Sequence, residues 1–152
     1  LVFEPVAFHL LKTADIVVYQ QVQQLSQQML SLSPAQAAAL FIDYWQGEGY
    51  FKALPGIMQQ KLTSQVGKVA ADFEALSAEP ARLTDYASSI RCPVLLLSGE
   101  QSQLPAQRVA RLLAEVLPDL VFRQLKTGHM GPVTDAELVN AILLEFIQCL
   151  KA

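Results

Sequence analysis

The chain has 152 residues and a formal net charge of −3, with 11 Lys and Arg residues against 14 Asp and Glu residues. Its 52% hydrophobic and 16% charged residues are enough to bury a core, which excludes a disordered chain and favours one domain, or one domain with a helical insertion. The slightly acidic balance gives no support for nucleic acid or an anionic membrane as a partner.

The sequence shows no segment typical of a membrane span or a secretory signal. No apolar run approaches the roughly 18 residues that a span needs. The first residues also lack the basic start and small-residue cleavage site of a signal peptide, so we expect a cytoplasmic protein. The sequence does not begin with Met. Either residues have been removed, or the chain is a piece of a longer protein.

The residue types that hold metals are few and scattered. Cys92 and Cys149 lie far apart, and there are only two histidines, so the sequence indicates neither a disulfide framework nor a metal site. No phosphate-binding glycine loop is present. We therefore expect no metal and no cofactor. Cys92 is expected to be a small buried hydrophobic residue, and His9, which lies among apolar residues, a structural histidine.

Residues 1–80 begin with a short strand and continue as helices. The apolar run 1–3 stops at Glu4-Pro5 and predicts a buried strand, with residues 1–13 as the strand and its connection. Residues 14–80 predict about three helices. One carries an apolar stripe on 14–32, one begins at a capping box formed by Ser33 and Gln36 and ends at Gly47, and one follows Pro55.

From residue 81 onward the pattern changes to alternating strands and helices. The continuous apolar run 93–97 is typical of a strand buried on both faces of a parallel sheet. A helix that begins at Pro105, a strand over 120–125 and a glycine-rich loop over 127–132 follow. A second capping box, Thr134 with Glu137, predicts the start of a last helix. We expect that helix to bury a set of apolar side chains: Leu138, Val139, Ile142, Phe146, Ile147 and Leu150. Strand, helix, strand and helix in this order predict an α/β fold with parallel strands.

These segments also stand in an order seen in a known family. The strand 93–97 ends in Gly99-Glu100, and a helix, a strand and Gly128-His129-Met130 precede a final helix that ends near Phe146. This order resembles the carboxyl-terminal part of an α/β-hydrolase. In that family the strand before the lid often ends as residues 1–5 do. The resemblance implies a partial α/β-hydrolase fold with about three parallel strands and flanking helices, a helical lid insertion at 14–80, and an α/β segment at 81–152.

The resemblance places a catalytic base at His129. The chemistry of the family needs an imidazole on a loop beyond the last strand, where it takes a proton from a serine and returns it to the leaving group. The neighbouring glycines are expected to let the loop turn sharply and approach the site. From the residues alone, a histidine in such a loop can also cap a helix or bind a backbone carbonyl.

The acid that would orient His129 has more than one candidate. The common family pattern after the Gly99 strand is G-x-x-D, but Ser102 stands at the fourth position. Some hydrolases place the acid after the preceding strand, where this chain has Glu4. Glu4 is therefore the better candidate, although a carboxylate at a strand end can equally well bind nearby backbone N–H groups. Glu100 is a third option.

The nucleophile expected from the resemblance is missing. The family uses G-x-S-x-G between a strand and a helix, and no such pattern occurs in residues 1–152. Two interpretations remain open. The chain is the carboxyl-terminal portion of a serine hydrolase that cleaves an ester or similar acyl bond of a small apolar substrate, and is inactive alone. Alternatively, it is a non-catalytic truncated homologue that acts as an oligomeric module and can bind a small apolar ligand.

A sheet of only three strands also has a consequence for assembly. The first strand would leave one edge unpaired, and unpaired apolar edges bind other chains. We therefore expect a homo-oligomer, most simply a dimer, with the first strand, the lid helices or both at the interface.

Overall fold

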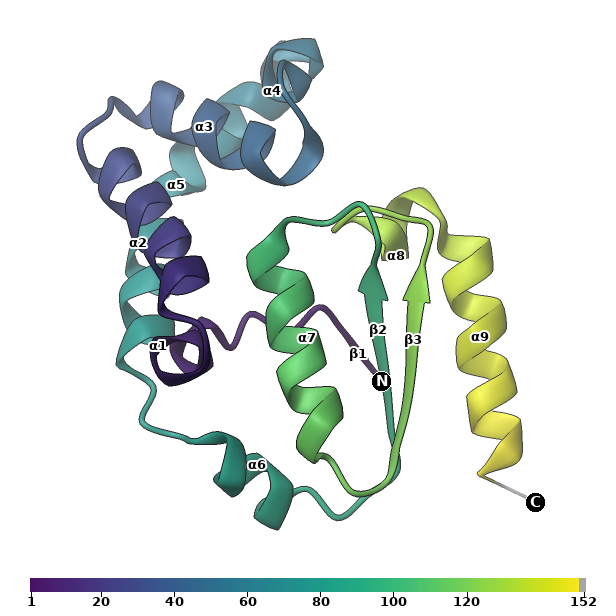
Figure 1. The fold of residues 1–152 in the computed structure, drawn as a ribbon. Helices are drawn as coiled ribbons and strands as arrows, with labels where there is room; N and C mark the ends of the chain where they lie inside the picture. The colour runs from purple at the N-terminus through teal and green to yellow at the C-terminus, as the bar shows by residue number, and fades with distance from the viewer. Residues whose placement is uncertain (151–152) are drawn as a thin grey trace. The chain divides into compact units, whose positions relative to one another are not determined.

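The computed structural model describes residues 1–150, which form two compact units (Figure 1). The first, here called the α/β unit, contains residues 1–6 and the chain from Ala81 onward. The second, here called the helical unit, contains residues 7–80. The helical unit is thus inserted in the chain between the first strand of the α/β unit and the rest of it.

The α/β unit is built on a parallel sheet of three strands, as the sequence predicts. The strands are β1 (Val2–Phe3), β2 (Val94–Gly99) and β3 (Leu120–Leu125), in the order β1-β2-β3. Val2 pairs with Leu96, and Val94 pairs with Leu120. Every residue of β2 is buried because β2 is the central strand and both of its faces are covered. Burial on both faces therefore accounts for every residue of the apolar run that predicted this strand.

Helices cover the two faces of this sheet (Figure 1). Helix α7 (Leu104–Val116) buries one apolar side that includes Ala106, Val109 and Ala110. On the other face Leu95 and Leu97 of β2 form a core cluster with Leu125 and Val139, the latter from α9 (Ala136–Cys149). Because side chains alternate along a strand, Leu96 points to the opposite face from Leu95 and Leu97. Two shorter helices complete the unit, α6 (Leu83–Ser89) and α8 (Gly131–Thr134).

The last helix differs from the sequence prediction in its start and in its burial. Thr134 does not cap it, because Thr134 is the last residue of α8 and Asp135 stands at the N-cap of α9; the Thr134 hydroxyl donates to the Asp135 carboxylate, 2.6 Å away. Of the apolar residues expected to be buried, Val139 is, and Ile142 and Phe146 pack partly buried against the core cluster. The remaining three are exposed: Leu138, Ile147 and Leu150. One face of α9 therefore has no covering element among the described residues.

Two smaller predictions about the α/β unit also need correction. Cys92 is exposed rather than buried, because it lies in the connection before β2 and not within the strand. Helix α6 was not expected from the sequence. Its first turn is held by Asp85, whose carboxylate accepts the Arg82 backbone N–H at 2.8 Å.

The helical unit consists of a short 3-10 turn and five helices. They are listed here in chain order: η1 (Phe8–Leu10), α1 (Leu11–Ala14), α2 (Ile16–Leu30), α3 (Pro34–Gln46), α4 (Tyr50–Ala53) and α5 (Gly56–Ala78). The predicted capping box at the start of α3 is present, since the Ser33 backbone N–H donates to the Gln36 side chain at 3.2 Å. The short α4 was not predicted, and the Asp43 carboxylate fixes it by accepting the N–H groups of Gly49 and Phe51.

Apolar stripes and aromatic rings hold the helical unit together. Four residues of the predicted stripe on α2 are buried: Val18, Val22, Leu25 and Met29. Trp45 stacks on Phe8 with ring centroids 6.3 Å apart, and Phe41 meets Phe73 edge to face at 6.1 Å. The aromatic residues therefore join α3 to both η1 and α5.

None of the helices described in residues 1–150 is long and apolar enough to cross a membrane. The expectation of a cytoplasmic location stays a prediction.

Candidate functional site

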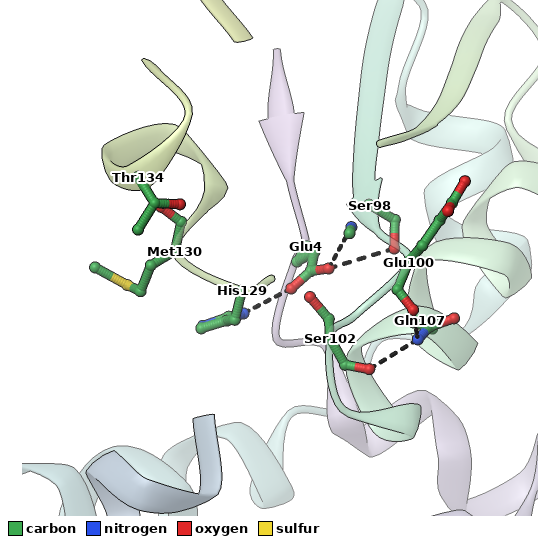
Figure 2. Close-up of polar contacts among 9 residues, drawn as sticks. Glu4, Ser98, Glu100, Ser102, Gln107, His129, Met130 and Thr134 are labelled. Carbon is green, nitrogen blue, oxygen red and sulfur yellow. Dashed lines mark hydrogen bonds and ion pairs between the residues drawn. The ribbon is translucent and has the colours of Figure 1, made fainter. Parts of the chain in front are cut away.

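Glu4 and His129 come together at the carboxyl ends of the strands in the α/β unit. Glu4 follows β1 directly, and His129 lies in the loop after β3. His129 Nδ1 is 2.7 Å from Glu4 Oε2, although the two residues are 125 positions apart in the chain (Figure 2). Parallel strands bring their carboxyl ends to one edge of a sheet, which is how two distant segments of the sequence meet here.

Glu4 is held tightly in place. Its side chain is fully buried, and its backbone N–H donates to the Leu97 carbonyl at 3.0 Å, which continues the pairing of β1 with β2. Its φ of 42° lies in the left-handed region, which is unfavourable for a residue with a side chain. Such strained positions persist where the surroundings determine them, and they concentrate at functional sites. Here the turn at Glu4 directs the carboxylate toward the His129 loop.

Two further groups contact the other oxygen of the Glu4 carboxylate. The Gly99 backbone N–H donates to Oε1 at 2.6 Å, and the Ser98 hydroxyl lies 3.4 Å from the same oxygen. Figure 2 shows the Ser102 hydroxyl pointing toward this carboxylate as well. The carboxylate therefore offers Oε2 to His129, while the residues at the end of β2 hold Oε1.

These contacts keep Glu4 ionised. Burial by itself raises the pKa of the carboxyl group, but the hydrogen bonds from His129 and from the Gly99 N–H outweigh it, helped by the nearby Ser102 hydroxyl, which is buried without a hydrogen-bond partner among the described residues, so the pKa lies below the ordinary value of 4.5. An ionised carboxylate only accepts hydrogen bonds, so the proton between the two side chains belongs to His129 Nδ1. In a neutral imidazole with this tautomer, Nε2 carries the basic lone pair.

Two glycines allow the segments of the site to approach one another. A Cβ atom on Gly99 would lie 2.4 Å from the Thr127 carbonyl oxygen and 2.7 Å from Ser102 Oγ. A Cβ atom on Gly131 would lie 2.5 Å from Thr127 Oγ1 and 3.0 Å from the Phe3 ring. Gly128, which was expected to provide a sharp turn, has no positive φ and no neighbour within 4 Å of a Cβ position. Close approach at Gly99 and Gly131, and not a sharp turn at Gly128, thus shapes the loop.

Neither Glu100, the other acid candidate, nor Ser102, at the position where the family has its usual acid, is directed to His129. Glu100 is exposed, and its side chain extends away from Glu4 in Figure 2. Ser102, at the position where the family pattern has Asp, is 8% exposed and points to Glu4 instead. Gln107 fixes this turn, since its amide donates to the carbonyl oxygens of Ser102 and Glu100 at 2.7 and 3.1 Å. Of the sequence candidates, the structure therefore brings Glu4 and His129 together.

Sequence reasoning missed the part that β2 plays in the site. Ser98 and Gly99 end a strand whose apolar run explained it completely, and nothing in the sequence pairs them with a glutamate 94 and 95 positions earlier. His9, the other histidine, is buried within the helical unit. Within residues 1–150, no group of three His, Cys, Asp or Glu residues is placed to hold a metal ion.

The fold is similar to that of a solved structure. No protein-family model and no curated protein matches the sequence. The structure of BpoC from Mycobacterium tuberculosis, named as a non-heme bromoperoxidase, matches with a TM-score of 0.57 and 22% sequence identity over 91% of this chain. BpoC has an α/β-hydrolase fold, and the match covers 55% of its length. Residues 1–150 thus have a partial α/β-hydrolase fold.

The close contacts at Gly99 lead to a prediction about stability. Gly99→Ala would place a methyl group against a backbone oxygen that cannot move without shifting the His129 loop, so we expect the α/β unit to lose about 1–3 kcal/mol of its free energy of unfolding. Gly128→Ala is the matched control and is expected to change it by less than about 0.5 kcal/mol. Urea denaturation, followed through the NMR signals of the β2 amides, measures the change in the free energy of unfolding for both variants. Equal changes in the two variants would contradict this account of the loop.

The lowered pKa of Glu4 leads to a prediction about acid. A carboxyl group with a lower pKa in the folded state stabilises the fold above its unfolded pKa, and the contribution is lost as the pH falls through the folded value. At pH 7 we expect Glu4→Gln to cost about 1–3 kcal/mol. The difference from the unchanged chain should shrink below pH 4.5. Urea denaturation at a series of pH values tests this, and a difference that grows toward low pH would rule it out.

Proposed function

We propose that this chain, with its partial α/β-hydrolase fold, is the carboxyl-terminal portion of a serine hydrolase and supplies the base and the acid of its catalytic triad. The observation that carries the proposal is the 2.7 Å contact between His129 Nδ1 and Glu4 Oε2. A buried carboxylate that orients an imidazole in this way is the arrangement that serine hydrolases use to activate the nucleophile. The 55% coverage of BpoC leaves room for a segment that this chain lacks.

In the proposed reaction the chain moves one proton. The serine, which lies outside residues 1–152, attacks the acyl carbon of the substrate while its hydroxyl proton passes to His129 Nε2. Glu4 stabilises the imidazolium that forms. His129 then returns the proton to the leaving alcohol as the bond between acyl carbon and leaving oxygen breaks. A second cycle with water releases the acid and restores the serine.

We propose a small apolar ester, or a similar acyl compound, as the substrate, and the helical unit as a lid. The chain enters the helical unit at Ala7, three residues after Glu4, and leaves it at Pro80. An insertion that begins so close to a catalytic group suits a segment that selects the substrate. At 22% identity the likeness to BpoC concerns the fold, so its named activity does not identify the substrate of this chain.

The hydrolase proposal is tested on the intact gene product, with a fluorophosphonate as the probe. We expect the label on a serine in a G-x-S-x-G motif encoded upstream of Leu1, and no label on the 152-residue chain alone. His129→Ala should slow labelling by about a thousandfold or more.

The control for Glu4→Gln is Glu145→Gln, because Glu145 is an exposed carboxylate that binds Arg123 on the surface. Glu4→Gln should slow labelling strongly, and Glu145→Gln should leave it unchanged. Labelling that does not depend on His129, or an intact gene product without such a serine, would refute the proposal.

The second candidate function is an oligomeric module without catalysis, and the open edge of the sheet favours it. Strand β1 pairs with β2 on one side and has no neighbour among the described residues on the other. Leu1, beside this edge, is 53% exposed, and Val2 is 38% exposed. We propose that two copies of this chain pair through the β1 edge, with the lid helices contributing to the interface.

Light scattering tests the dimer on the purified 152-residue chain. We expect a dimer at low micromolar concentration, and a monomer for Leu1→Lys because a charge at a strand edge opposes pairing. Leu144→Lys is the control, since Leu144 is 58% exposed in α9, whose packing against the core runs through Val139, Ile142 and Phe146. A monomeric unchanged chain would exclude the dimer and would leave the hydrolase proposal untouched.

A further inference from the structure

Two serines surround the Glu4 carboxylate and have no role in the mechanism described above. Ser98 is fully buried at the end of β2, and its hydroxyl lies 3.4 Å from Glu4 Oε1. Ser102 is 8% exposed in the turn that follows β2, and its hydroxyl points to the same carboxylate (Figure 2). We propose that Ser98 and Ser102 are positioning residues, which hold the Glu4 carboxylate in place beside His129. This inference rests on the proposed function, and it concerns how the protonation of the proposed base, His129, is controlled.

The structure fixes both hydroxyls by backbone contacts. Ser98 is paired with Gln124 in the centre of the sheet. Ser102 closes a turn through its N–H to the Gly99 carbonyl at 3.3 Å, and its own carbonyl accepts the Gln107 amide at 2.7 Å. Its Oγ also lies against Gly99, where only a glycine leaves room for it. Both hydroxyls are therefore held beside the carboxylate without the help of His129.

The need for these donors follows from the burial of Glu4. A buried carboxylate loses its hydration, and the loss must be offset by hydrogen bonds or by a nearby positive charge. His129 is the ionisable group whose charge acts on Glu4, while the other carboxyl group drawn in Figure 2, that of Glu100, extends away from Glu4. If the donors at Oε1 were absent, the carboxylate would attract a second proton onto His129.

This second proton would impair the proposed base. An imidazolium has no lone pair at Nε2 and cannot accept the proton of the serine. The Ser98 hydroxyl and the Gly99 N–H donate to the carboxylate, and the Ser102 hydroxyl faces it from nearby; together they weaken its pull on that proton. The two serines thus act through Glu4 on the protonation of His129, without touching the substrate.

The test is the titration of the His129 ring in the purified 152-residue chain, followed by nitrogen-detected NMR. The chain has two histidines, so His129→Gln assigns the signals. Removing a donor and removing the acid should shift the midpoint in opposite directions. Ser98→Ala and Ser102→Ala should each raise the midpoint by about half a pH unit, and the double variant by about one. Glu4→Gln should lower it by about one unit, because the negative charge is lost.

The control is Ser89→Ala, an exposed serine of the same unit, which should leave the midpoint unchanged. If the serines served only to support the local structure, their removal would loosen the pair and lower the midpoint as Glu4→Gln does. A lowered or unchanged midpoint in the serine variants would overturn this inference, while the Glu4→Gln shift would still support the acid–base pair. An unchanged midpoint in Glu4→Gln would overturn the proposed function and this inference together.

Discussion

The buried carboxylate of Glu4 is the constraint on which the α/β unit depends. A charged group inside a protein is tolerated only where donors surround it, and here those donors come from two separate parts of the chain. The end of β2 provides the Gly99 N–H and the Ser98 hydroxyl, and the loop after β3 brings His129. The same contacts that make the charge tolerable also bind β1 to the rest of the sheet at the carboxyl ends of its strands. The contacts of Glu4 therefore serve both the stability of the sheet and the proposed orientation of His129.

Local sequence patterns predicted the elements of this chain wherever one physical signal was strong. The apolar run of β2 needed no other explanation than burial on both faces, and the capping box at Ser33 identified the start of α3. Thr134 shows why the same signal fails elsewhere. The tight loop around Gly131 continues as the short helix α8 up to Thr134, so Asp135 and not Thr134 stands at the start of α9. Capping motifs describe what a side chain can bind, whereas tertiary contacts decide what it does bind.

The site was predictable in part. The resemblance to a known family led to His129, and the absence of Asp at position 102 directed attention to Glu4. The distance between the two, the strained turn at Glu4 and the donors at Ser98 and Gly99 depend on how β1 pairs with β2, and no local pattern contains that register. Apolar periodicity also overestimated the burial of α9, because it reports a preference for burial and not the presence of a partner. Leu138 and Ile147 meet that preference in sequence but have no covering element in the described part of the chain.

The pairing of β1 with β2 also has a consequence for how the chain folds as it is made. Val2 pairs with Leu96, so β1 leaves the ribosome 94 residues before its partner. At ordinary rates of translation this is a delay of about 5–20 s. The helical unit, whose contacts are local, can fold in that interval, but a two-residue strand cannot persist alone. Glu4, the proposed acid of the site, therefore gains its contacts with Gly99 and His129 only after the helical unit and β2 have been made.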